Sequence, residues 1–204
     1  MKIIVLADEC GKEEFMSKKI IADTEVSYVN NLDPIFYSAD AFFILKEINI
    51  EDPNAFAGKP VFINSVISTL KELNLPENFS RINGWPTFVK REIWEIASPN
   101  NDAVKIFEML QWKYIKVADE PGLVSARIIS MIINEAYFAL GEDVSSKNEI
   151  DLAMKLGTNY PYGPFEWCKK ISLKKVYDLL EKLSETDSRY TIAPAMKNEF
   201  TTTD

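Results

Sequence analysis

The stretch Glu149-Ile-Asp-Leu-Ala-Met-Lys-Leu-Gly-Thr-Asn-Tyr-Pro-Tyr-Gly-Pro-Phe-Glu166 decides how the second half of the chain folds. Ser146 precedes Glu149 by the spacing of a capping box, which predicts a helix that runs through residue 156. Gly157 is predicted to be the left-handed residue that ends this helix. Residues 159–164 then form a rigid aromatic turn, and Pro164 suits the first position of a short helix over residues 165–169.

Helices are also predicted on both sides of this stretch. Residues 123–140 are apolar on nearly every side, which predicts a helix covered by its own domain and by a second subunit. Its polar residues Arg127, Ser130 and Asn134 share one face and predict either a hydrogen-bonded seam between domains or a ligand contact. Ser172 is predicted to cap a last amphipathic helix, and the polar residues after Thr186 are expected to be loose.

The first half of the chain alternates short strand-like runs with weaker helical pieces. Strands are predicted over residues 2–7, 41–45, 60–63 and 114–117, and helices over 12–21 and 103–110. The pattern becomes helical around Pro121-Gly122. The sequence therefore predicts an α/β N-terminal domain with a reduced Rossmann-like sheet, residues 1–118, followed by an all-α C-terminal domain, residues 119–204.

Composition narrows the function classes. The net charge of −8 argues against nucleic-acid partners and anionic membrane surfaces, and no apolar run is long enough to span a bilayer. The two cysteines lack metal-ligand spacing and are expected to be reduced thiols in a cytoplasmic protein. The chain has no histidine, so any general base must be a carboxylate, lysine, tyrosine or cysteine.

Four segments together resemble the 3-hydroxyacyl-CoA dehydrogenase family. Residues 149–166 are similar to the family's D-I-D-x-A-M-x-x-G-x-x-x-P-M-G-P-F-E, and residues 119–127 to its D-x-P-G-F-x-x-N-R junction between two domains. Residues 62–65 resemble the S-N-T-S strand end, and residues 83–95 resemble the H-F-F-N-P…E segment. The resemblance covers roughly residues 60–183 and is strongest from Asp119 onward.

This resemblance implies a Rossmann-like domain and an all-α domain that commonly forms a dimer interface. It also implies oxidation of 3-hydroxyacyl-CoA with NAD, in which a histidine–glutamate pair acts as the base while a serine and an asparagine position the substrate. Glu95 fits the family glutamate, and the histidine position falls on Asn83. The serine position falls on Val66, or on Ser65 if the strand end shifts by one residue, and the asparagine position falls on Ala126.

The cofactor half departs further from the family pattern. The turn after the first strand, residues 8–14, carries one glycine among four acids, and the glycine fingerprint G-x-G-x-x-G occurs nowhere. The stretch before Asn64 is shorter than in the family, so whole strand–helix units are expected to be missing. From these residues we expect no cofactor, with NAD bound only if the chain still oxidises its substrate.

Three functional hypotheses follow. The first is a divergent family member without ordinary NAD-dependent oxidation, which retains acyl-CoA binding or serves as a subunit. The second is an active acyl-CoA enzyme with Glu95 as base, in which Arg81, Lys90 and Arg91 either face a CoA phosphate or are solvated surface charges. The third is a purely structural homodimer, assembled through the C-terminal helical domain.

Overall fold

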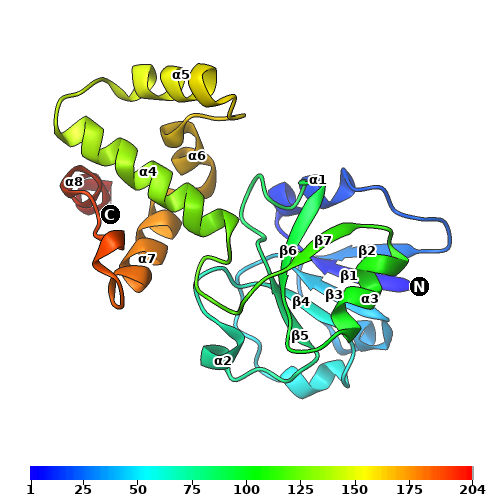
Figure 1. Cartoon of the computed structure of the whole chain (residues 1–204). Helices are drawn as coiled ribbons and strands as arrows, with labels where there is room; N and C mark the ends of the chain where they lie inside the picture. The colour runs from blue at the N-terminus through cyan, green and yellow to red at the C-terminus, as the bar shows by residue number, and fades with distance from the viewer. Residues whose placement is uncertain (204) are drawn as a thin grey trace. The chain divides into compact units, whose positions relative to one another are not determined.

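The computed structural model describes residues 1–203, apart from the side chains of residues 37 and 203. By its internal contacts the chain divides into two compact units, Met1–Leu123 and Val124–Asp204. The division falls five residues after the boundary predicted from the sequence, and Figure 1 shows a sheet-containing unit and a helical unit. The predicted fold class is confirmed: an α/β unit is followed by an all-α unit.

A single sheet forms the centre of the first unit. Its strands lie in the order β2-β1-β3-β4-β5-β6-β7, and every neighbouring pair is parallel except β5 and β6. Three strands, β2, β5 and β6, were not predicted from the sequence. The strands are β1 (Lys2–Leu6), β2 (Glu25–Val29), β3 (Ala41–Ile44), β4 (Val61–Asn64), β5 (Phe79–Ile82), β6 (Ile93–Ala97) and β7 (Lys113–Lys116).

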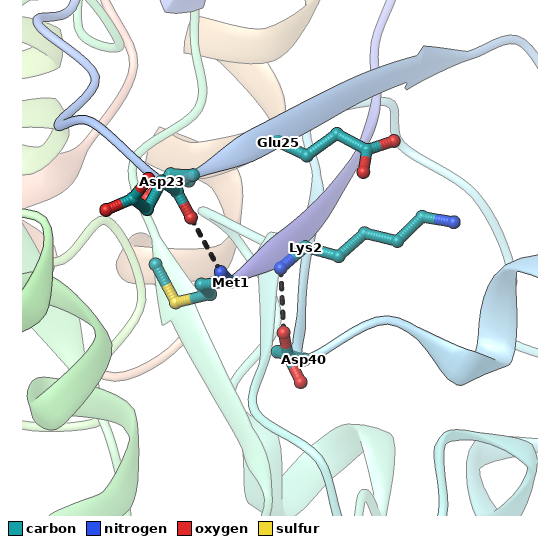
Figure 2. A pocket seen from close by; sticks show the side chains of 6 residues that line it. Met1, Lys2, Asp23, Glu25 and Asp40 are labelled. Carbon is teal, nitrogen blue, oxygen red and sulfur yellow. Dashed lines mark hydrogen bonds between the residues drawn. The ribbon is translucent and has the colours of Figure 1, made fainter.

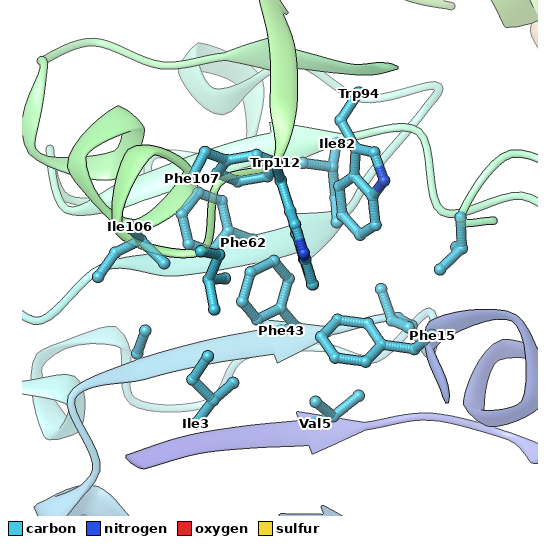
Figure 3. Packing of buried hydrophobic residues seen from close by; sticks show 14 of the residues in the cluster. Ile3, Val5, Phe15, Phe43, Phe62, Ile82, Trp94, Ile106, Phe107 and Trp112 are labelled. Atoms are coloured by element: carbon cyan, nitrogen blue, oxygen red, sulfur yellow. The ribbon is translucent and has the colours of Figure 1, made fainter. Parts of the chain in front are cut away.

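Helices cover both faces of this sheet because its central strands are apolar on both sides. On one face, an aromatic cluster includes Phe15 of α1 (Glu9–Met16) and Phe107 of α3 (Asp102–Met109). In Figure 3 these rings converge on Phe43 of the sheet, whose ring stacks on that of Phe62 with centroids 4.6 Å apart. On the other face, strand residues pack against Phe56 of η2 (Pro53–Phe56) and Leu70 of α2 (Leu70–Leu73), near η1 (Pro34–Ser38).

The second unit is organised around its longest helix, α4 (Ser125–Gly141), which contacts each of the four helices that follow. These are α5 (Lys147–Thr158), α6 (Pro164–Ile171), α7 (Leu173–Ser184) and α8 (Pro194–Thr203), with η3 (Ser188–Tyr190) between the last two. The structure corrects the expectation of a loose tail, because η3 and α8 are ordered against α7 and α4. None of the helices in residues 1–203 is long and apolar enough to cross a membrane.

A buried asparagine explains the ordered tail. Asn134 of α4 accepts a hydrogen bond from the Ala193 N–H at 2.9 Å and donates one to the Thr191 carbonyl, also at 2.9 Å. Both partners belong to the same unit as Asn134. The polar side chain predicted to line an interdomain seam or a ligand site therefore anchors the start of α8 instead.

The signature stretch forms a cap between two helices. The buried Asp151 carboxylate of α5 accepts hydrogen bonds from the Phe165 and Glu166 N–H groups at 2.8 and 3.1 Å, at the start of α6. Gly163 allows this approach, because a Cβ there would lie 2.3 Å from Asp151 Oδ1. The predicted capping box at Ser146 and the predicted cap at Ser172 are confirmed. The left-handed residue that ends α5 is Asn159, with φ 55°, and not Gly157.

Candidate functional site

The three predicted site residues belong to three neighbouring strands. Two follow the carboxyl ends of β4 and β5, and the third lies within β6. Ser65 directly follows β4, and Asn83 directly follows β5, its parallel neighbour. The antiparallel register of β5 and β6 pairs Ile82 with Ile96, so one further step along the register sets Asn83 opposite Glu95. Strand pairing thus brings the predicted pair together from positions 12 residues apart in the sequence. The catalytic roles of these residues stay predictions.

Asn83 and Glu95 are both almost buried, at 7% and 8% exposure. Asn83 Oδ1 accepts a hydrogen bond from the Trp85 N–H at 3.3 Å, while its Nδ2 has no hydrogen-bond partner among the described residues. A carboxamide can donate to a carbonyl oxygen but cannot take up a proton at neutral pH. The two residues therefore supply a hydrogen-bond donor and a carboxylate from two paired strands.

The serine position is held by backbone contacts. Ser65 Oγ donates to the Ser68 carbonyl at 2.8 Å, and the Ser65 carbonyl accepts from Arg81 Nε at 2.6 Å. Val66, the alternative position, is buried in the apolar interior and binds Arg81 only through its carbonyl, at 2.9 Å. Of the two alternatives, only Ser65 has a polar side chain.

Arg81 is neither a surface charge nor a group facing a CoA phosphate. Its side chain is 0% exposed, and Nη1 forms an ion pair with Asp119 Oδ1 at 2.6 Å. Burial lowers the pKa of the guanidinium, and the hydrogen bond to Asp119 raises it. Asp119 also accepts from the Leu70 N–H at the start of α2, at 2.9 Å. Arg81 thus connects the end of β4, the start of α2 and the segment before the helical unit.

A second polar residue at this edge was missed by the sequence reasoning. The Asn64 side chain donates to the Leu45 carbonyl after β3 at 2.9 Å and accepts from the Gly84 N–H after β5 at 3.0 Å. A Cβ on Gly84 would lie 2.6 Å from Asn64 Cγ, so only glycine fits there. The glycine directly after Asn83 was the available signal in the sequence.

The ends of β1 and β3 define the part of this edge where a nucleotide would bind. The chain leaves β1 for β2 on one side and returns to β3 on the other, which is the topological switch point of an open parallel sheet. α1 starts there, and its Gly11 lies close enough to β3 that a Cβ would be 3.6 Å from Leu45 Cβ. The Asp8 carboxylate already accepts the Gly11 N–H at 2.7 Å.

A cavity of about 540 Å³ lies at the opposite edge of the sheet. In Figure 2, Lys2 and Glu25 at the starts of β1 and β2 line it together with Asp23 and Asp40. The Lys2 N–H donates to Asp40 Oδ2 at 2.7 Å, which ties this carboxylate to the sheet. Because ligands of parallel sheets bind at the carboxyl ends of the strands, we assign this acidic cavity no role in the candidate site.

The fold and the edge geometry define a class of protein: an α/β unit of the dinucleotide-binding type followed by a helical unit. The family model "3-hydroxyacyl-CoA dehydrogenase, C-terminal domain" matches residues 122–202. The mitochondrial hydroxyacyl-coenzyme A dehydrogenase of Rattus norvegicus is 32% identical over 208 residues, 94% of this chain and 66% of that enzyme. The chain belongs to the 3-hydroxyacyl-CoA dehydrogenase family.

Other relatives match shorter stretches. The 3-hydroxyadipyl-CoA dehydrogenase of Escherichia coli K12 is 46% identical over 69 residues, which cover 34% of this chain and 14% of that protein. The chain thus matches only a minor part of that relative. The crystal structure of (S)-3-hydroxybutyryl-CoA dehydrogenase from Ralstonia eutropha matches with a TM-score of 0.73 and 17% identity, over 99% of this chain and 94% of that one. This last similarity supports the fold.

These findings correct the expectation that the chain has no cofactor. The dinucleotide-binding fold is present, and the family to which the chain belongs is one of NAD-dependent dehydrogenases. The turn after β1 had suggested that no dinucleotide binds, because it lacks the G-x-G-x-x-G fingerprint. The structure nevertheless places Gly11 and the first turn of α1 at the switch point. NAD bound there would lie against the segment from Asp8 to Gly11 and the end of β3.

Proposed function

We propose that this chain is a divergent 3-hydroxyacyl-CoA dehydrogenase-family protein that binds an acyl-CoA ligand and performs ordinary NAD-dependent oxidation only slowly. The observation that carries the proposal is the position of Asn83 opposite Glu95, with a buried Nδ2 that lacks a partner among the described residues. An unpaired buried donor has a free-energy cost of about 1–3 kcal/mol, which a ligand carbonyl would remove. The site is therefore suited to holding a carbonyl.

The same substitution weakens proton transfer. In the family the histidine takes the proton of the substrate hydroxyl and the glutamate supports it. Asn83 can form a hydrogen bond with that hydroxyl but cannot take its proton. Loss of a general base typically lowers a rate by about 10²–10⁴. Bound NAD would supply the hydride acceptor. The remaining contributions of the chain are a hydrogen bond from Asn83 and the negative charge of Glu95.

The alternative function is an active acyl-CoA enzyme that uses Glu95 itself as base. Its support is the burial of Glu95 at the candidate site, next to the position that the family histidine would occupy. The two proposals differ in what happens when Glu95 loses its charge. Under the first, the wild-type rate is already close to background; under the second, Glu95→Gln removes a substantial rate.

One experiment separates them. NADH-dependent reduction of acetoacetyl-CoA is measured for the wild type, Asn83→His, Glu95→Gln and the double variant, with ligand binding measured by calorimetry. We expect a low wild-type rate and a rise of about 10²-fold or more in Asn83→His, because a histidine can give the ketone oxygen the proton that reduction requires. The double variant should lose that rise. Asn83→Ala is the matched control, because it removes the hydrogen-bond donor and restores no group that can transfer a proton.

A wild-type rate typical of dehydrogenases that disappears in Glu95→Gln would favour the alternative. A high wild-type rate unchanged in Glu95→Gln would contradict both proposals. Absence of acetoacetyl-CoA binding to the folded wild type would contradict the proposed ligand.

We further propose that the chain forms a homodimer through its helical unit. Its α4 was expected to be covered on all sides, yet Ile128 is 52% exposed. Leu152 and Leu156 of α5 are also exposed and lie one helical turn apart. Sedimentation at micromolar concentration should give twice the mass of one chain, and a monomer would contradict the proposal. The cytoplasmic location stays a prediction.

A further inference from the structure

The loop between β5 and β6 is hydrogen-bonded to α1 through a single carboxylate, that of Glu14. This site loop, residues 84–91, directly follows Asn83. Glu14 of α1 accepts the Thr87 N–H through Oε1 at 2.6 Å and the Lys90 N–H through Oε2 at 3.4 Å. Two backbone donors that share one carboxylate make a small anion-binding concavity. In this structure its occupant comes from the protein itself.

The loop also ends in a cation. The Arg91 guanidinium lies 3.9 Å from the centroid of the Phe88 ring. Burial lowers the pKa of Arg91, while the charges of Glu95 and Glu14 raise it. Glu95 and Glu14 therefore act electrostatically on the same guanidinium. A carboxylate in the place of Glu14, held by the Thr87 and Lys90 N–H groups, would therefore also be attracted by the charge of Arg91.

The loop keeps polar atoms that its own contacts leave unsatisfied. Thr87 is 7% exposed, and its Oγ1, like Asn83 Nδ2, has no hydrogen-bond partner among the described residues. Thr87 also has φ 80°, a conformation that β-branched residues rarely adopt. Both unsatisfied atoms belong to one short segment, with Asn83 directly before the loop and Thr87 within it. Two buried polar atoms of this segment are therefore left without a hydrogen-bond partner among the described residues.

We propose that the site loop is a carboxylate-binding site, filled by Glu14 in the free protein, and that its ligand is an acyl-CoA with a second carboxylate. This inference rests on the proposed acyl-CoA function. The incoming carboxylate displaces Glu14 from the Thr87 and Lys90 N–H groups and gains the positive charge of Arg91. Glu14 is only partly buried, so once displaced it can be solvated. Its carboxylate is the internal competitor of the ligand.

The test compares two thioesters of equal chain length, glutaryl-CoA with a terminal carboxylate and valeryl-CoA without one. Their dissociation constants are measured by calorimetry for the wild type, Glu14→Gln and the matched control Glu13→Gln on the same helix. Charge-assisted hydrogen bonds are about twice as strong as neutral ones. The neutral glutamine of Glu14→Gln should therefore compete less well than Glu14 for the Thr87 and Lys90 N–H groups. We expect this variant to bind glutaryl-CoA about tenfold more tightly than the wild type does, with valeryl-CoA unchanged; a tenfold change is 1.4 kcal/mol. Glu13→Gln should change neither.

A second variant covers the case in which Glu14→Gln fails to fold. In Arg91→Gln, glutaryl-CoA should lose its affinity relative to valeryl-CoA because the cation is gone. If valeryl-CoA binds but neither variant changes the ratio of the two constants, the inference is wrong and the proposed function stands. If neither thioester binds to the folded wild type, the proposed function and the inference both fail.

Discussion

The Arg81–Asp119 pair offers the sharpest test of how the first unit is held together. In Asp119→Ala, the guanidinium of Arg81, 0% exposed, keeps its backbone acceptors but loses its only charged partner among the described hydrogen bonds. The Leu70 and Lys71 N–H groups at the start of α2 lose an acceptor at the same time. The variant therefore removes the ion-pair partner of a buried charge, on which Glu72 and Glu120 act only at longer range, and removes a contact at the start of α2.

The expected loss of stability follows from these contacts. Removing one partner of a buried ion pair costs about 3–5 kcal/mol, and the lower end applies because the Asp119 side chain is 31% exposed. Losing the acceptor at the start of α2 adds about 1 kcal/mol. The sum of about 4 kcal/mol is a large part of a typical stability of about 5–15 kcal/mol. It corresponds to a fall in Tm of roughly 8–16 °C for a chain of this length.

Urea unfolding followed by tryptophan fluorescence measures this loss, because Trp85, Trp94 and Trp112 all lie in the first unit. Lys105→Ala is the control. It removes a pair with the same 2.6 Å separation from Asp102, but both of those side chains are mostly exposed, so no measurable change is expected. A loss below about 1 kcal/mol in Asp119→Ala would refute the claim that this pair is a buried structural connection.

Three further predictions concern single residues. Gly163→Ala places a Cβ 2.4 Å from Asp151 Cγ and should destabilise the helical unit by about 2 kcal/mol in thermal unfolding, with partial rescue by Asp151→Ala; an unchanged Tm would contradict the close approach. Thr87→Gly relieves a positive φ and should stabilise the chain by about 1 kcal/mol in urea unfolding, and a net loss would show that the loop is not strained. Burial raises the pKa of Cys168 to about 11 from its ordinary value of 9.0, so its stabilising effect is complete below pH 9 and is lost as the pH rises from 9 to 11. Stability should fall by up to about 2 kcal/mol more in the wild type than in Cys168→Ala over that interval, and equal slopes would contradict the effect of burial.

The sequence predicted the features that depend on neighbours a few residues away. The capping box at Ser146 and the cap at Ser172 were correct because each hydrogen bond spans three residues. The sequence predicted that Gly157 would end α5, whereas the structure shows that Asn159 does. Both residue types tolerate the left-handed conformation, so local patterns do not choose between them. The role of Asp151 as a cap lay beyond such patterns because its partners are 14 and 15 residues away.

Long-range contacts account for the elements that were missed. β5 contains Arg81, whose charge breaks the apolar pattern of a buried strand, and this charge forms an ion pair with Asp119, 38 residues later. The ordering of α8 depends on Asn134, 57 and 59 residues before its partners. At the candidate site, the residue types could be assigned by resemblance to Asn83 and Glu95. Their position opposite each other follows from the β5–β6 register.

The sequence alone therefore determined the order of an α/β half and a helical half, the family resemblance, and the absence of any histidine from the chain. These features depend on composition and on the spacing of nearby residues, both of which can be taken directly from the amino-acid sequence. Only the tertiary structure decided that Arg81 is an interior connection, that Gly11 lies at the switch point, and that Glu14 occupies the site loop. Each of these depends on hydrogen bonds or packing between segments that are distant in the sequence. No local sequence pattern specifies which distant residue will form the contact.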